Sequence, residues 1–331
     1  MLRLLFIGGT GNISASVSRL CIQKGFELTL INRGKSGSIA GAESIVCDIN
    51  DRAAVEQAVA GRHFDAVVNW VAFTPAEIER DIELFRGRTG QYVFISSASV
   101  YQKPPANCIV TESTPLVNPY WEYARDKIQC EQRLMRAFTE EQFPVTIVRP
   151  SHTYDTVIPL AIGGWREYTA VQRIKKGQPV ISHGDGTSLW VLTHSRDFAK
   201  GFTGLLGNPR ALGNAFHITS DEVLTWDQIY TAIGDAVGRT PNIVHVPTDV
   251  LIHEDEYLEG TLLGDKTWSV IFDNTKIKRL VPSFVCEIPF NVGIRETLAW
   301  FEARPERMVI SERTNSLIQR ICSRMERLHV D

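Results

Sequence analysis

The stretch FIGGTGNIS, residues 6–14, decides the fold. An apolar run ends at Ile7, three glycines follow within four residues, and a helical pattern begins near Ser14. A glycine-rich turn between a strand and a helix lets the backbone approach a phosphate, because free N–H groups and the helix dipole face the turn. Glycine also serves such turns for steric reasons alone, so this stretch by itself leaves nucleotide binding and a plain turn equally open.

The first half of the chain alternates β-rich runs with stretches of helical length. After the opening run LRLLFI (2–7), the runs are FELTLIN (26–32), SIVC (44–47), FDAVVNW (64–70), QYVFIS (91–96) and PVTIVR (144–149). Short apolar strands that alternate with helices are typical of a doubly wound parallel sheet with helices on both faces. The sequence therefore predicts an α/β, Rossmann-type domain that binds a dinucleotide over residues 1–150.

The texture of the sequence changes at about Ser151. Paired glycines and short strands such as AFHI (215–218) and NIVHV (242–246) lie among helical patterns. We therefore expect a smaller, mixed α/β C-terminal lobe over residues 151–304 that binds the substrate. Some later segments are expected to return to the first domain.

The last stretch, NSLIQRICSRMERLHVD (315–331), has the spacing of an amphipathic helix. One helical face carries Leu317, Ile318, Ile321, Met325 and Leu328. Arginines surround this face. The pattern predicts a C-terminal helical segment over residues 305–331 that docks on the body of the protein or on another subunit. It is our candidate surface for a homodimer.

Composition argues against several classes of protein. The 331 residues are 44% hydrophobic and 22% charged, with a formal net charge of −3 and a pI near 6.3, so general binding to nucleic acid is not expected. No stretch of about 18 apolar residues is present, which predicts a cytoplasmic protein without a membrane span. The six cysteines are scattered, without the Cys/His spacing of a zinc site, and we expect no metal.

Residues after the second and third predicted strands indicate which nucleotide the turn holds. INRGK (31–35) supplies Asn32, Arg33 and Lys35 where a dinucleotide domain reads the ribose, and no carboxylate is there. A guanidinium can bind a 2′-phosphate as a fork, so NADP(H) is favoured, with NAD(H) as the alternative. Asp48 is predicted either to accept the adenine amino group or to cap the helix that starts near Ala53.

Two further motifs together form a proton-transfer set. YARDK (123–127) places Tyr123 and Lys127 on one face of a helix, and ISSAS (95–99) brings Ser97 to the carboxyl edge of the sheet. A nearby ammonium and an oxidised nicotinamide both favour phenolate, so Lys127 is expected to lower the pKa of Tyr123 and to hold a ribose hydroxyl. Tyr123 would then move the hydroxyl proton of a substrate as hydride leaves the carbon, while Ser97 holds the same oxygen.

In this order, the motifs resemble the extended short-chain dehydrogenase/reductase family, the group of NAD(P)-dependent sugar-nucleotide epimerases and dehydratases. The resemblance runs from Met1 to about Arg304 and is carried by FIGGTGNIS, VVNWVAF (67–73), SSASVY (96–101), YARDK and IVRPSHTYD (147–155). The roles it implies are the phosphate turn for Gly8, Gly11, Asn12 and Ile13, adenine for Asp48, ribose for Val71 and Ala72, and catalysis for Ser97, Tyr123 and Lys127. It also implies that His152 faces the substrate, where the family commonly has an asparagine.

The chain departs from the family at two places that bear on the substrate. Ala98 and Ser99 stand where dehydratases of the family carry an Asp-Glu pair, which disfavours removal of water and leaves Ser99 as a candidate substrate contact. Trp190 and Leu262 stand where sugar-nucleotide members carry arginines, which disfavours a diphosphate substrate. Trp165 and Trp190 are candidate walls of an apolar or sugar-stacking pocket, with core packing as the alternative for each.

We therefore expect an NAD(P)-dependent oxidoreductase or epimerase that acts on a secondary alcohol or ketone of a sugar or sugar derivative. One alternative is an NADPH-dependent ketone reductase whose substrate carries no nucleotide. TSLWVLTHSRDFA (187–199) is also similar to a branch of the family whose chloroplast members contact RNA, so a non-catalytic nucleotide- or RNA-binding protein is the second alternative. The retained set of Ser97, Tyr123 and Lys127 favours an enzyme.

Overall fold

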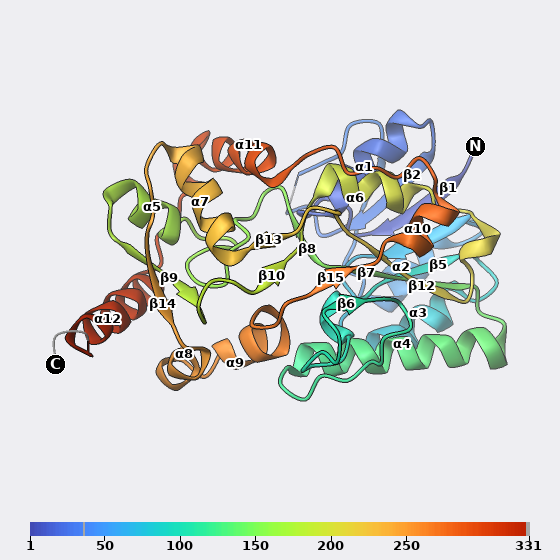
Figure 1. Ribbon diagram of the computed structural model, residues 1–331. Coiled ribbons are helices and arrows are strands. Elements are labelled where there is room, and N and C mark those ends of the chain that lie inside the picture. Colours follow the sequence, from blue (N-terminus) through green and yellow to red (C-terminus); the bar gives the residue numbers. More distant parts are fainter. Residues whose placement is uncertain (36, 329–331) are drawn as a thin grey trace.

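A seven-stranded parallel sheet forms the centre of the molecule. The computed structural model describes residues 1–35 and 37–328, and for residues 326–328 the backbone alone. The strand order is β12-β7-β5-β4-β1-β2-β3. Figure 1 labels β1, β2, β5, β7 and β12 of this sheet, at the right of the view. The strands are β1 (Arg3–Ile7), β2 (Glu27–Asn32), β3 (Glu43–Val46), β4 (Ala66–Asn69), β5 (Tyr92–Ile95), β7 (Val145–Pro150) and β12 (Asn214–Ile218). The predicted Rossmann-type α/β fold is confirmed.

Helices cover both faces of this sheet because each strand turns alternate side chains to opposite faces. In β1, Leu4 and Phe6 pack in one apolar cluster, and Leu5 and Ile7 pack in another. The first cluster includes residues of α1 (Ser14–Gln23), α6 (Ser195–Thr203) and α10 (Thr275–Leu280). The second includes residues of α2 (Arg52–Val59), α3 (Pro75–Phe85) and α4 (Glu122–Glu141). Burial on both faces explains why the strands are near-continuous apolar runs in the sequence.

The strand order changes direction between β1 and β4. Strands β2 and β3 extend the sheet on one side of β1, whereas β4, β5 and β7 extend it on the other. In open parallel sheets, ligands bind outside the carboxyl ends of the strands at such a point. The glycine turn follows β1 and Val71 follows β4, so both border this crevice.

A smaller lobe of short strands and helices follows β7 and encloses two further apolar clusters. Its strands form the pairs β8 (His152–Tyr154) with β11 (Leu192–His194), β9 (Pro179–His183) with β14 (Asn242–Val246), and β10 (Leu189–Trp190) with β13 (Leu224–Thr225). Its helices include α5 (Thr169–Lys176), α7 (Trp226–Val237), α8 (Thr248–Glu254), α9 (Leu258–Thr261) and α11 (Phe290–Glu302). Short helical turns also occur along the chain as a whole. They are η1 (Ala98–Val100), which follows β5, η2 (Pro209–Ala211), the π-helical η3 (Leu262–Lys266) and η4 (Pro305–Arg307).

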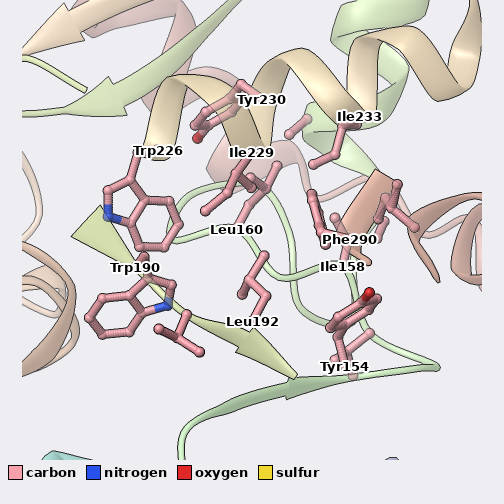
Figure 2. Packing of buried hydrophobic residues seen from close by; sticks show 14 of the residues in the cluster. Tyr154, Ile158, Leu160, Trp190, Leu192, Trp226, Ile229, Tyr230, Ile233 and Phe290 are labelled. Carbon is pink, nitrogen blue, oxygen red and sulfur yellow. The ribbon is translucent and has the colours of Figure 1, made fainter. Parts of the chain in front are cut away.

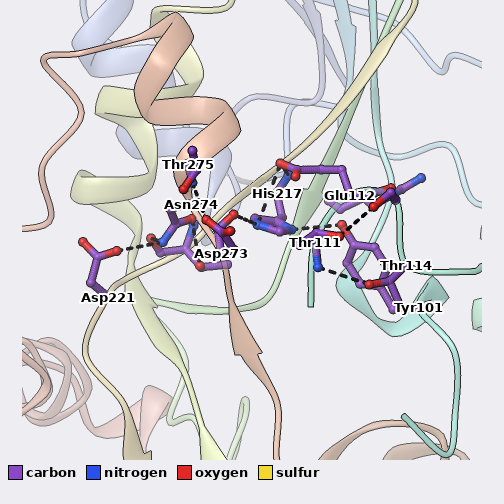
Figure 3. Close-up of polar contacts among 12 residues, drawn as sticks. Tyr101, Thr111, Glu112, Thr114, His217, Asp221, Asp273, Asn274 and Thr275 are labelled. Carbon is purple, nitrogen blue, oxygen red and sulfur yellow. Dashed lines mark hydrogen bonds and ion pairs between the residues drawn. The ribbon is translucent and has the colours of Figure 1, made fainter. Parts of the chain in front are cut away.

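Later segments of the chain cross back to the central sheet. Strand β12 is one of its two edge strands, and β15 (Ile271–Phe272) pairs with β6 (Ile109–Val110) in a separate two-stranded sheet. A buried polar cluster joins these segments (Figure 3): the Nδ1 of His217 lies 3.0 Å from the Tyr101 hydroxyl and its Nε2 lies 2.8 Å from the Asp273 carbonyl oxygen. Segments beyond residue 150 therefore belong to the sheet, and the boundaries at residues 150 and 304 stay predictions.

The C-terminal helix α12 (Glu312–Leu328) begins later than residue 305 and packs on its own chain. Leu317, Ile318 and Ile321 are buried against β9 and α8, while the side chain of Leu328 lies outside the described residues. The homodimer therefore stays a prediction, because this chain itself covers the described part of that apolar face. Within the described residues, no helix combines the length and the apolar character that crossing a bilayer requires.

Candidate active site

The glycine turn forms a cradle at the carboxyl end of β1. Gly8 and Gly9 have φ angles of +95° and +104°, and a Cβ on Gly9 would lie 2.7 Å from the Leu30 Cδ2 atom. Helix α1 begins at Ser14 without a side-chain cap at Ile13. Of the N–H groups nearby, that of Gly11 donates to the Ser14 Oγ at 2.9 Å and that of Ala15 donates to the Gly11 carbonyl oxygen at 3.0 Å. Backbone close to the surface and an uncapped helix start are what a pyrophosphate requires. The turn therefore fits a dinucleotide.

Asn12 joins this turn to the C-terminal lobe. Its side-chain amide donates to the Thr153 carbonyl oxygen at 2.9 Å, and the Thr156 N–H donates to the Asn12 Oδ1 at 2.9 Å. Both ends of the side chain are thus used within the protein. Asn12 therefore holds the glycine turn against the lobe that follows β7.

We expect the adenosine part of the dinucleotide to bind in a groove of about 630 Å³ along the ends of β1, β2 and β4. Gly8, Gly11, Asn32, Arg33, Asp48 and Val71 all line it. Arg166 reaches the same groove from the C-terminal lobe, a role that the sequence did not indicate. Asp51, and not Asp48, caps helix α2, because its carboxylate accepts the Ala54 N–H at 3.1 Å. The alternative capping role of Asp48 is therefore wrong.

A second cavity, of about 590 Å³, adjoins this groove and holds the proton-transfer set. The two share the wall residues Gly11, Ser14, Trp70 and Phe73. Ser97 comes from the end of β5, and Tyr123 and Lys127 come from the first turns of α4. The groove that Arg33 lines and the cavity that Tyr123 and Ile13 line are thus neighbours.

Lys127 is anchored to the backbone of the sheet edge. Its ammonium donates to the carbonyl oxygens of Ala72 and Ile95, each at 2.7 Å, which leaves one of its three N–H bonds free. Ala72 therefore contributes its carbonyl oxygen to this site, while its side chain is buried. Burial lowers the pKa of Lys127 to about 8, so the cation persists at neutral pH.

The expected effect of Lys127 on Tyr123 is wrong for this structure. Burial raises the pKa of Tyr123 to about 12, and a hydrogen bond with Ser97 offsets part of that rise. The Lys127 ammonium lies 5.7 Å from the centre of the Tyr123 ring and donates to two backbone carbonyls, so burial outweighs its effect on this pKa. Tyr123 is accordingly a protonated phenol at neutral pH, which suits it to donate a proton.

Ser99 donates two hydrogen bonds to Ser97. The Ser99 hydroxyl donates to the Ser97 Oγ at 2.9 Å, and the Ser99 N–H donates to the same oxygen at 3.2 Å. Ser97 therefore accepts two hydrogen bonds, and its own hydroxyl hydrogen is directed elsewhere. Ser99 also lines the cavity, where it was predicted to touch the substrate.

The substrate end of the cavity is aromatic. His152, Trp121 and Trp165 line it together with Asp265 and Lys266 of η3. Trp190 does not line it: this side chain is buried, and its indole Nε1 donates to the His152 Nδ1 at 3.2 Å. Core packing, the alternative for Trp190, is therefore what the structure shows.

Sequence reasoning missed Asp265, Trp121 and Asn118. Asn118 donates to the carbonyl oxygens of Ser99 and Gly264, at 2.8 and 2.7 Å, and so ties the serine segment to η3. A Cβ on Gly264 would lie 2.8 Å from the Trp121 Cβ, which shows how closely η3 approaches α4. The two glycines around η3, Gly260 and Gly264, were the available signal for this approach.

The model of the NAD dependent epimerase/dehydratase family matches residues 4–219, which is more than half of the chain. The chain belongs to this family. It is therefore an NAD(P)-dependent enzyme of the oxidoreductase and epimerase type. The matched span covers the glycine turn, the serine segment and the Tyr/Lys helix.

Two curated relatives of this chain have names that indicate different functions. The 2′-dehydrokanamycin reductase of Streptomyces kanamyceticus is 28% identical over 290 residues, covering 86% of this chain and 80% of the relative. The chloroplast stem-loop binding protein of 41 kDa b from Arabidopsis thaliana is 26% identical over 259 residues, covering 73% of this chain and 65% of the relative. The first is named as a reductase and the second as a stem-loop binding protein.

Solved structures confirm the fold. The epimerase Mth375 from Methanothermobacter thermautotrophicus has a TM-score of 0.74 at 16% identity, covering 93% of this chain and 94% of that one. The UDP-glucose 4-epimerase from Bifidobacterium longum, solved with NAD⁺ and UDP, has a TM-score of 0.72 at 18% identity, covering 92% and 99% of the two chains. At these identities the likeness extends to architecture alone.

Proposed function

We propose that the chain is an NADP(H)-dependent reductase that acts on a ketone of a sugar derivative lacking a nucleotide diphosphate. The observation that carries this proposal is the composition of the substrate cavity. Among its described lining residues there is no arginine, and its two lysines are both engaged: Lys127 with backbone carbonyls and Lys266 with Asp265 at 3.1 Å. A diphosphate buried there would lack the charge-assisted forks that such a group needs.

The aromatic walls of the cavity favour a sugar ring. Trp165 is about half exposed, and its φ of +60° is strained for a bulky residue, which costs on the order of 1–3 kcal/mol. A pair of backbone hydrogen bonds with Ile158 holds this conformation. Its ring lies 5.7 Å from that of His152. Strain that presents an apolar ring to a cavity is typical of a ligand contact, and the relative named as a reductase of dehydrokanamycin supports a non-nucleotide sugar.

In the proposed reaction, three side chains handle the substrate oxygen and the cofactor ribose. The nicotinamide of a bound NADPH would supply the hydride. Tyr123 donates its phenolic proton to the ketone oxygen as the alcohol forms, because its raised pKa keeps it protonated. Ser97 holds the same oxygen with its remaining hydroxyl hydrogen, and Lys127 offers its third N–H to a ribose hydroxyl.

Arg33 carries the proposed preference for NADP(H). We expect Arg33→Ala to lower the ratio of NADPH to NADH affinity by about 10-fold or more, because one charge-assisted bond to a phosphate contributes roughly 1.5–3 kcal/mol. Fluorescence titration with both coenzymes measures the ratio. Arg19→Ala, which removes an exposed arginine from α1, is the matched control. An unchanged ratio in Arg33→Ala would exclude the NADP(H) preference.

A substrate panel tests the activity itself. The enzyme is mixed with NADPH and keto derivatives of free sugars and amino sugars, and oxidation of NADPH is followed. The same enzyme with NAD⁺ is given UDP-glucose and UDP-galactose, and their interconversion is followed. We expect NADPH oxidation with the first group. Interconversion of the nucleotide sugars without net coenzyme consumption would make the protein an epimerase and overturn the proposal.

A further inference from the structure

Trp190 fixes the hydrogen-bonding role of His152. The indole Nε1 of Trp190 lies 3.2 Å from the His152 Nδ1. An indole N–H can only donate, so Nδ1 must be the accepting nitrogen of the imidazole. Trp190 itself cannot turn away, because it is buried and packs on Trp226 with ring centres 5.5 Å apart (Figure 2).

His152 is held as a neutral ring. Burial and the cation of Lys266 keep its pKa well below the usual 6.5. A neutral imidazole that accepts at Nδ1 carries its proton on Nε2. Within the described part of the chain, no residue forms a hydrogen bond with this Nε2, and His152 lines the cavity that also holds Tyr123. The free N–H is therefore the one polar group that His152 can offer to a ligand.

We propose that Trp190 is a positioning residue that sets His152 as an Nε2–H donor to an oxygen of the substrate. This inference deepens the function proposed above and rests on it. A donor at this point selects an acceptor, such as a hydroxyl, carbonyl or ring oxygen, and disfavours an ammonium group, which has only donors. The subsite thus favours an oxygen over an ammonium group at the one position of the substrate that faces His152.

Charged groups from the neighbouring elements preserve this state. Lys266 and its ion-pair partner Asp265 face the cavity from η3, and Tyr123 and Lys127 face it from α4. The cation of Lys266 opposes a second positive charge on the imidazole. The hydrogen bond from Trp190 acts in the same direction, because only the neutral ring has a lone pair on Nδ1. Loss of the indole N–H therefore raises the pKa of His152.

The tautomer can be measured without any substrate. The protein is labelled with ¹⁵N-histidine, and spectra that correlate ring nitrogens with ring protons are recorded for the wild type, Trp190→Phe and His152→Gln, the last of which assigns the signal. We expect a protonated Nε2 and an unprotonated Nδ1 in the wild type, and a mixture of tautomers in Trp190→Phe. A wild-type ring protonated on Nδ1, or a spectrum unchanged in Trp190→Phe, would overturn the positioning role.

Kinetics test whether the donor reaches the substrate. With a ketone found in the panel, Trp190→Phe is expected to raise KM about 10-fold with a smaller effect on kcat, and to add an acidic limb to the pH profile of kcat/KM. His152→Gln, which keeps an amide donor, is expected to recover part of the loss seen in His152→Ala. Trp300→Phe, remote from the cavity, is the matched control. A shifted tautomer with unchanged kinetics in Trp190→Phe would overturn the substrate contact while leaving the reductase proposal intact.

Discussion

Replacing Tyr123 by phenylalanine is expected to lower kcat for ketone reduction by about 10²–10⁴-fold, the usual contribution of a positioned general acid. The phenylalanine ring keeps the contacts of the tyrosine ring with Trp121 and Phe73, whose centres lie 4.9 and 6.3 Å away. The variant therefore loses the proton donor and little else. Single-turnover reduction with bound NADPH measures the effect.

Coenzyme binding is the control for this variant. Because Lys127 and the glycine turn are unchanged, the affinity of Tyr123→Phe for NADPH should stay within about 2-fold of the wild type, and its melting temperature should not fall. Turnover at the wild-type rate would show that another group moves the proton. Loss of coenzyme affinity together with activity would show that Tyr123 serves binding instead.

Removing Glu131 is expected to lower the free energy of unfolding by about 3–5 kcal/mol, the cost of leaving a buried charge without its partner. Glu131 follows Lys127 by one helical turn on α4, and its carboxylate binds Arg149 of β7 through two hydrogen bonds of 2.9 and 2.6 Å. Both side chains are about 95% buried. In Glu131→Ala the guanidinium of Arg149 stays in the interior without its carboxylate. Among the described residues it keeps only the Glu112 carbonyl oxygen, at 3.2 Å, and the face of the Tyr101 ring. Denaturant unfolding measures the loss.

Two controls separate this effect from a general weakening of the fold. Glu83→Ala removes a carboxylate from an exposed ion pair with Arg52 and should leave the midpoint of unfolding unchanged. The double variant Glu131→Leu with Arg149→Met removes both charges and should regain most of the lost stability. A double variant as unstable as Glu131→Ala would mean that packing, and not the unpaired charge, causes the loss.

The sequence predicts the sheet well because its inner strands β1, β4, β5 and β7 are buried on both faces. Six of the seven strands coincide with the apolar runs quoted for the first half of the chain, and Gly8 and Gly9 lie where a positive φ is needed. Strand β12 was assigned to the C-terminal lobe, because AFHI is short and nothing in its letters shows that it pairs with β7. The local sequence pattern thus predicts which segments are strands and helices. Which distant strands pair with each other is known only from the structure.

The sequence likewise predicts some residues of the candidate site, whereas others are found only in the structure. Ser97, Tyr123 and Lys127 occur in short motifs, and their meeting at one sheet edge follows from the order of the strands. Asp265 comes from a π-helical turn far along the chain, which no local pattern places beside Tyr123. The pKa of Tyr123 also depended on burial and on where Lys127 points, neither of which the spacing of YARDK contains.

The most direct test of the account is a crystal structure of the enzyme with NADP⁺. The dinucleotide should lie across the carboxyl ends of β1 and β4, with its pyrophosphate on the turn at Gly11, its 2′-phosphate against Arg33 and its nicotinamide beside Tyr123. A dinucleotide bound elsewhere, or one whose nicotinamide lies out of reach of the Tyr123 hydroxyl, would contradict the account.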